Sequence, residues 1–194
     1  MAAIASGTVV AADRGALAQR LAPPGESACA AMEAVVLRVG LDGPVGRSAG
    51  HRRIRSAVAR CRPGRDGVRP GDEELARIVW SLRQPEVRDR ALLLSLGEDA
   101  AAAETLWTEC TRRAPSPLDA FPAALVAVCS YLRGDGAMAN TALDRALDSE
   151  PGNPLAGLLR DALDACVAPR QLRALLVEAG RCAGVPGPFG APAR

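Results

Sequence analysis

Apolar residues recur every three to four positions along most of this chain, which is the period of an α-helix. The clearest case lies between residues 139 and 147, where one helical face carries Ala139, Ala142, Leu143, Ala146 and Leu147. No run alternates apolar and polar residues for long enough to indicate a sheet. The pattern predicts an all-α fold of about ten short helices in antiparallel hairpins, joined mostly by short loops.

Clusters of proline and glycine mark where the predicted helices end. The densest internal breaker is the run LDGPVG at 41–46, and a second breaker-rich loop lies at 63–71. Asp72 is expected to cap the helix that follows this loop. The apolar stripes between the breakers predict helices over the ranges 14–21, 26–39, 47–62, 72–82, 85–96, 98–113, 121–132, 139–147, 155–166 and 170–179.

The stretch from 131 to 153 has the pattern of one helical hairpin corner. Gly134 suits the left-handed residue at which a helix ends, and Asp135 can cap the next helix. Small residues on that helix let two helix axes approach closely, and Pro151 ends it. The stretch resembles the tetratricopeptide repeat, and these residues stand in its register: Gly134, Ala139, Leu143, Ala146 and Pro151.

The breakers divide the chain into five parts. Residues 1–13 are expected to be disordered or a residual N-terminal segment, and 180–194 a disordered tail. The parts between them are the N-terminal helices at 14–40, an arginine-rich helix with flanking linkers at 41–71, and a helical, tetratricopeptide-like domain at 72–179.

Composition adds little that is functional. Apolar residues make up 48% of the 194 residues and aromatic residues only 3%, which favours helices over strands. All 24 basic residues are arginine, which we attribute to a GC-rich codon bias, because Ala, Gly and Pro are abundant too. The net charge of +2 indicates no general demand for an anionic partner.

The cysteines predict neither a metal site nor a disulfide framework. All six are at least sixteen residues apart, so no CxxC-type ligand pair exists and structural zinc is not expected. Free thiols on apolar stripes are typical of a reducing cytoplasm, and the N-terminal residues lack the pattern of a secretory signal. We therefore expect a cytoplasmic protein with no membrane span, no cofactor and no bound metal.

An arginine-dense segment at 47–69 is the sharpest candidate for chemistry. Guanidinium groups suit phosphate, so Arg52, Arg53, Arg55 and Arg60 are possible anion-binding residues. No aromatic residue interleaves them to stack on bases, and a solvated helix face is the alternative interpretation. His51, the only histidine, has no partnered Cys or Asp in the local pattern, so we expect a solvated residue and no enzyme.

Other residues are interpreted as structural or interaction residues. Arg88, Asp89 and Arg90 form a charged triplet beside an apolar face, and an interhelical ion pair is the favoured explanation, with a groove lining as the alternative. Trp107 falls on an apolar stripe, so core packing is expected. Asp144 lies off the apolar face of the 139–147 helix and joins the same set of interaction or structural candidates.

The order and spacing of several runs resemble the C-terminal part of the actinobacterial domain-of-unknown-function family 4192. The runs are ALAQRLAPPG at 16–25, DEELARIVWSL at 72–82, VRDRAL at 87–92, LWTECTRRAP at 106–115, GDGAMANTALDRALDSEPGN at 134–153 and LLRDALDA at 158–165. The resemblance implies a further N-terminal region that this chain lacks, and hence a truncated or shorter member. It implies no reaction.

Two functions from different classes follow. The first is a helical scaffold or protein-interaction module without catalytic activity, completed by a protein partner or by the missing N-terminal region. It predicts a surface groove or an exposed apolar patch near residues 14–39. The alternative is arginine-mediated nucleic-acid or anion binding through residues 47–69. It predicts salt-sensitive binding that neutralising Arg52, Arg53 and Arg55 abolishes.

Overall fold

The computed structural model describes residues 14–43, 46–64 and 69–182, and all regular structure in these ranges is helical. The fold is therefore all-α, as the apolar periodicity predicts. Ten α-helices and one 3-10 turn are described: α1 (Arg14–Arg20), α2 (Glu26–Leu41), α3 (Arg47–Arg60), α4 (Asp72–Ser81), α5 (Pro85–Leu93), η2 (Leu94–Leu96), α6 (Ala100–Arg113), α7 (Ala120–Leu132), α8 (Gly136–Ser149), α9 (Pro154–Asp164) and α10 (Pro169–Cys182).

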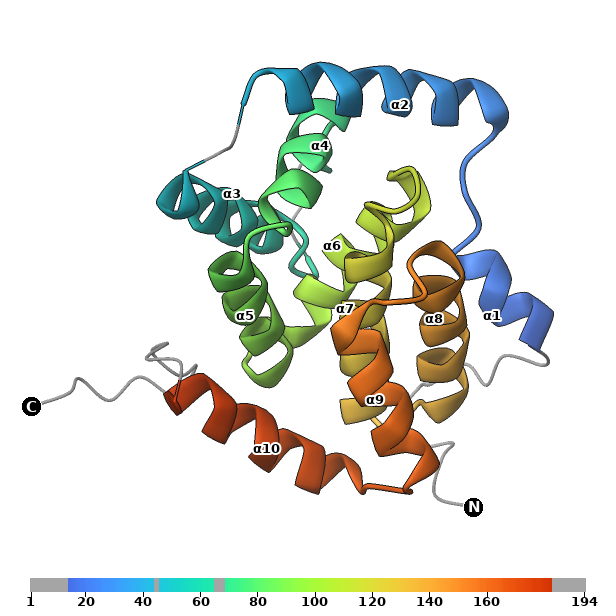
Figure 1. Ribbon diagram of the computed structural model, residues 1–194, viewed down its shortest axis with the longest axis vertical. Helices are drawn as coiled ribbons and strands as arrows, with labels where there is room; N and C mark the ends of the chain where they lie inside the picture. The colour runs from blue at the N-terminus through green and yellow to red at the C-terminus, as the bar shows by residue number, and fades with distance from the viewer. Residues whose placement is uncertain (1–13, 44–45, 65–68, 183–194) are drawn as a thin grey trace, which may run out of the picture.

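The helices surround a central hairpin of α7 and α8 (Figure 1). α6 packs on the other side of α7, and α1 and α9 pack against α8. On the opposite side of the molecule α3 contacts α4, α5 and α6. α2 runs along one edge above α4, and α10 crosses the far end, where it contacts α5 and α7. Both the first and last described helices are thus held on the body by packing.

The corner between α7 and α8 is formed by the two residues that the sequence indicates, Gly134 and Asp135. Gly134 has φ +89, a left-handed conformation that glycine adopts without strain. The Asp135 carboxylate accepts a hydrogen bond from the Met138 backbone N–H at 3.0 Å, which caps α8. Ala139, Ala142 and Ala146 are fully buried, so α8 lies close against α7. This pairing is compatible with a tetratricopeptide-like hairpin.

Three local predictions were wrong. Asp72 does not cap α4: Gly71 holds the cap position, and Asp72 pairs with Arg113 at the end of α6. The 85–96 helix ends at Leu93 and tightens into η2, where the Ser95 hydroxyl donates to the Leu92 carbonyl.

The third wrong prediction is the start of the tail. α10 continues through Cys182, because Gly180 packs directly on Leu93 of α5 and Arg173 donates to the Leu96 carbonyl at 2.9 Å. The rest of the expected tail, 183–194, and the expected N-terminal segment, 1–13, lie outside the described residues.

Buried thiols contribute to the core. Cys110 and Cys129 lie inside it, and burial raises the pKa of the Cys129 thiol to about 12, so both behave as small apolar side chains at neutral pH. Within the described part of the chain, no helix is both long and apolar enough to cross a bilayer.

Candidate functional site

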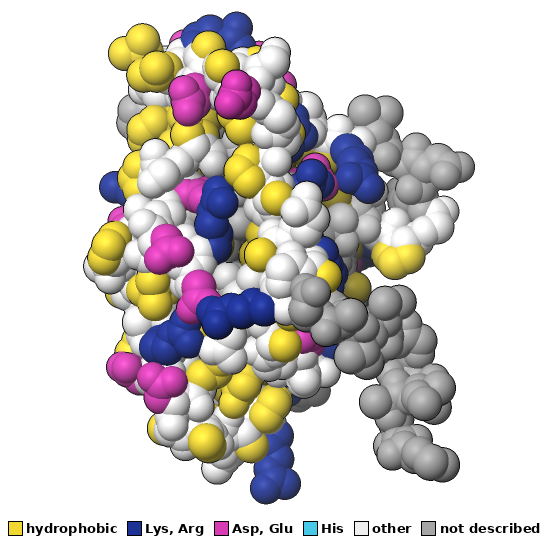
Figure 2. Space-filling model, turned by 90° about the vertical axis from the view of Figure 1, so that its right-hand side faces the viewer, with side chains coloured by type: hydrophobic (Ala, Val, Ile, Leu, Met, Phe, Trp, Pro, Cys, Tyr) yellow, Lys and Arg dark blue, Asp and Glu magenta, His cyan; other side chains and the backbone are white. Residues whose placement is uncertain are grey.

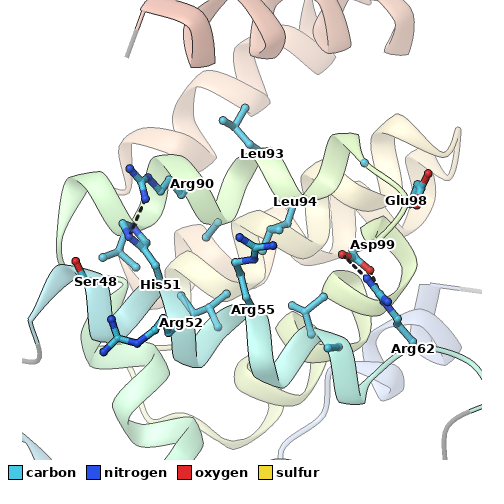
Figure 3. Close-up of a pocket in the computed structure, with 16 residues that line it drawn as sticks. Ser48, His51, Arg52, Arg55, Arg62, Arg90, Leu93, Leu94, Glu98 and Asp99 are labelled. Carbon is cyan, nitrogen blue, oxygen red and sulfur yellow. Dashed lines mark hydrogen bonds and ion pairs between the residues drawn. The ribbon is translucent and has the colours of Figure 1, made fainter. Parts of the chain in front are cut away.

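A cleft of about 790 Å³ separates α3 from α5 and η2 (Figure 3). One wall is a single face of α3 and its C-terminal end, because the lining positions Ser48, His51/Arg52, Arg55, Ala59 and Arg62 follow one another at helical spacing. The other wall presents Arg90 and Leu94 from α5 and η2, and the loop into α6 closes one end. The cleft runs along about 20 Å of α3 at 1.5 Å per residue.

The floor of the cleft is apolar. It is formed by side chains whose buried parts also belong to the core, namely Ile54, Val58, Val87, Ala91 and Leu93. α10 packs against α5, where Gly180 contacts Leu93. A ligand that enters the cleft therefore meets a preformed apolar surface between charged rims.

One end of the cleft contains an ion pair between Arg62 and Asp99. Arg62 donates to both Asp99 carboxylate oxygens, at 2.6 and 3.1 Å. The hydrogen bond from Arg62, helped by the nearby charge of Arg55, keeps the pKa of the Asp99 carboxyl below its ordinary value. Asp99 is therefore ionised at neutral pH and neutralises Arg62. The exposed Glu98, which makes no ion pair with another described residue, also lines this end of the cleft.

At the other end His51 lies between two helices. Its Nδ1 is 3.2 Å from a terminal nitrogen of Arg90, and its Nε2 is 3.2 Å from the Glu86 backbone oxygen. Arginine only donates and a carbonyl only accepts, so both contacts form together only in the neutral ring with the proton on Nε2. His51 thus positions Arg90 at the rim and fastens α3 to α5.

Between these two ends lie Arg52 and Arg55, two arginines of the cleft lining that make no ion pair with another described residue. Both are exposed, both line the cleft, and neither makes a hydrogen bond or ion pair with another described residue. In Figure 3 the Arg55 guanidinium lies over the middle of the cleft, between the His51–Arg90 pair and the Arg62–Asp99 pair. The two residues are three positions apart on α3, but in Figure 3 the Arg52 guanidinium points outward at the open edge of α3, away from Arg55.

The other predicted anion-binding arginines lie elsewhere. Arg60 pairs with Glu74 and also donates to Ser56 at 3.3 Å. Arg53 is half-buried away from the cleft lining, and its Nη1 is buried without a partner in the described chain. Arg47 and Arg69 are engaged too, with Glu86 at 2.8 Å and Glu109 at 3.1 Å. Four of the seven described arginines of the segment therefore pair with carboxylates of the fold.

The charged triplet is split between two surroundings. Arg88 lies over the Phe121 ring at 5.3 Å from its centroid, which is a cation–π contact, and Arg90 lines the cleft beside His51. Asp89 is exposed and forms no ion pair with another described residue. None of the three residues forms an ion pair with another described residue, so the favoured interhelical ion pair is not found, and the groove lining applies to Arg90 alone.

The remaining structural candidates hold helices together. Trp107 is fully buried at the centre of the core, as its apolar stripe predicts. Asp144 accepts from Arg14 of α1 and from Arg160 of α9, the second at 2.6 Å. Figure 2 faces the side of the molecule on which Figure 1 labels α1 and α8, and arginine and acidic side chains lie next to one another on this surface. Trp107 and Asp144 therefore both contribute to packing or to contacts between helices.

A second, smaller hollow of about 450 Å³ lies between α2, the end of α4 and the loop before α7. Its lining includes Val36, Leu37 and Trp80. Leu37 is 67% exposed and Leu41, one turn further on, is 85% exposed. The interaction-module hypothesis predicts a surface groove or an exposed apolar patch near residues 14–39, and this hollow and Leu37 lie in that part of the chain.

No group of three or more His, Cys, Asp or Glu side chains within 14–43, 46–64 and 69–182 is placed to hold a metal ion. Sequence reasoning found Arg52 and Arg55 but missed the partners that complete the cleft, Arg62, Asp99, Val87 and Leu94. The signal for the opposite wall was present in the spacing of Val87, Arg90, Ala91 and Leu94, which places all four on one helical face.

Comparison with known proteins identifies one family. The model of the family described as domain of unknown function (DUF4192) matches residues 1–170, which include both walls of the cleft. The comparisons with curated proteins and with solved structures found no match.

Proposed function

The chain belongs to domain-of-unknown-function family 4192, and we propose that it is a helical protein-interaction module without catalytic activity, whose α3–α5 cleft binds an acidic segment of a partner protein. The observation that carries this proposal is the position of Arg52 and Arg55. Two arginines that make no ion pair with another described residue line a cleft with an apolar floor, and the Arg55 guanidinium lies over its middle (Figure 3).

The shape of the cleft favours a helical or extended segment as the ligand. Its wall is as long as three to four turns of helix, and apolar positions run along its floor. A segment with apolar residues on one face and two carboxylates about one turn apart would fill the floor and satisfy both arginines. The Arg62–Asp99 and Arg90–His51 contacts hold the two ends of the cleft in place before binding.

The alternative, nucleic-acid or anion binding through residues 47–69, depends on the same two guanidinium groups. It has less support, because Arg47, Arg60, Arg62 and Arg69 each pair with a carboxylate of the chain itself. Only part of the segment's formal charge is thus available for phosphate contacts.

The proposal also covers the cellular compartment of the protein and its structural and family relationships. We place the module in the cytoplasm, where thiols such as those of Cys110 and Cys129 stay reduced, and we treat the α7–α8 region as tetratricopeptide-like. We also propose, from the resemblance alone, that it corresponds to the C-terminal part of an actinobacterial family member.

A peptide selection tests the proposal. A library of random 16-residue peptides is selected against the full chain, and the binders are measured by fluorescence anisotropy at low and high salt. We expect binders with apolar residues at helical spacing and Asp or Glu one turn apart. The double variant Arg52→Glu/Arg55→Glu should bind them about 100-fold more weakly, about tenfold for each lost charge-assisted contact.

The matched control is Arg20→Glu/Arg170→Glu, which makes the same charge change at exposed arginines outside the cleft. Selected peptides without acidic residues, or an equal loss in the control, would contradict the proposal. A 20-base-pair DNA duplex is measured in parallel. DNA binding that is steeply salt-dependent and lost in the cleft variant, with no acidic peptide selected, would establish the alternative.

A further inference from the structure

α2 presents an apolar seam on its outer face that the rest of the described chain does not cover. Ala30, Ala34, Leu37 and Leu41 follow one another by four, three and four residues, which is the spacing of the a and d positions of a heptad. All four are exposed, Leu37 at 67% and Leu41 at 85%. In Figure 1 α2 runs along the upper edge of the molecule, and the other helices lie on one side of it.

The inner face of α2 is already used. Met32, Val36 and Val39 are buried, and they lie on the opposite side of the helix from the seam. Gly40 fits against Trp80 so closely that a Cβ there would lie 2.7 Å from the ring, and Trp80 donates to the Val36 carbonyl at 2.9 Å. The helix is thus fixed on α4 with the seam pointing outward, so the seam is a preformed surface.

Charged residues flank the seam in an asymmetric way. Glu33 precedes the first a position at 34 and takes position g, and Arg38 follows the d position at 37 and takes position e. Glu33 makes no ion pair with another described residue, whereas Arg38 donates to Glu73 at 3.4 Å. A ligand on the seam therefore meets the free carboxylate of Glu33, and Arg38 has to exchange its contact with Glu73 to bind it.

We infer that the seam binds a second copy of this chain, with the two α2 helices side by side and parallel. In a parallel pair each g residue lies near the e residue five positions later on the other helix, so Glu33 of each copy meets Arg38 of the other. Ala30 and Ala34 then face themselves where the helices are closest, and Leu37 and Leu41 fill the layers after them. An antiparallel pair would place g positions beside g positions and e positions beside e positions, so neither Glu33–Arg38 ion pair would form.

This inference goes beyond the proposed function, because α2 lies outside the α3–α5 cleft. The seam is about 17 Å long at 1.5 Å per residue, so the contact is small. Small interfaces are typical of weak, reversible assemblies, and the dimer is therefore expected in the micromolar range of concentration. Dimerisation would place two clefts in one particle and raise the apparent affinity for a partner with two acidic segments.

Sedimentation equilibrium of the full chain, from about 1 to about 200 µM, tests the inference, since this range brackets a micromolar dissociation constant. We expect a monomer–dimer equilibrium in the wild type. Leu37→Glu should weaken the dimer by at least about tenfold, because it places two like charges in an apolar layer. The control Leu158→Glu, on α9, changes a residue that is equally exposed at 70% and should leave the equilibrium unchanged.

A charge exchange tests the orientation. Glu33→Arg alone should weaken the dimer, and Glu33→Arg/Arg38→Glu should restore it, because the exchange rebuilds both ion pairs only in the parallel arrangement. Circular dichroism shows whether each variant keeps its helix content. A monomer at every concentration, a dimer that Leu37→Glu leaves intact, or a failure of the double exchange to restore it would each overturn the inference.

Discussion

Replacement of Trp107 by alanine should lower the free energy of unfolding by about 3–5 kcal/mol, the range typical of a large aromatic side chain removed from a core. Trp107 is fully buried on α6, which packs against α7 and also contacts α3, the helix that forms one wall of the cleft. Truncation leaves a cavity in the core beside α6. Urea unfolding followed by circular dichroism measures the change.

The matched control is Trp107→Phe. The indole Nε1 is buried and has no hydrogen-bond partner in the described chain, so the native residue already carries the cost of an unsatisfied donor. Phenylalanine removes that donor and keeps most of the apolar volume, and its cost should be below about 1.5 kcal/mol. Equal costs for the two variants would mean that the packing of the indole ring does not stabilise the core.

Loss of the Arg145 side chain should also destabilise the fold strongly, by about 3 kcal/mol. Its Nε donates at 2.8 Å to Asp119, whose carboxylate is only 1% exposed at the start of α7. Arg145→Ala leaves that buried charge with the Ser149 hydroxyl as its remaining side-chain donor. The α7–α8 hairpin would then contain an unbalanced carboxylate in its contact surface.

Arg160→Ala is the comparison for this effect. Arg160 also pairs with a carboxylate on α8, Asp144, but that carboxylate is 36% exposed, so water replaces the lost partner. Its removal should cost about 1 kcal/mol or less. If the two arginine variants lost equal stability, burial of Asp119 would not be the reason for the importance of Arg145.

Much of the fold could be predicted from the sequence because its signals are local. The 3.6-residue periodicity identifies each helix. The corner between α7 and α8 depends on the backbone conformation of Gly134 and on the cap that Asp135 provides, and both are local. The errors arose where distant residues decide the local structure. Asp72 is drawn into a pair with Arg113, and α10 extends to Cys182 because it packs on α5.

The candidate site could be predicted only in part for the same reason. The arginine-rich segment is visible in the sequence, but which arginines remain free depends on contacts with Glu74, Glu86, Asp99 and Glu109, which lie 14 to 40 residues away. A charge count over residues 47–69 therefore overstates the available charge. The apolar floor also needs both α3 and α5, so no single segment contains the cleft.

The central claim is that the α3–α5 cleft binds an acidic segment. The most direct measurement is the NMR spectrum of the isotopically labelled full chain, recorded with and without an acidic peptide obtained by the selection described above. The account predicts that the shifted amide signals concentrate in α3 and α5, around Arg52, Arg55 and Arg90. Shifts confined to other helices, with α3 and α5 unchanged, would contradict it.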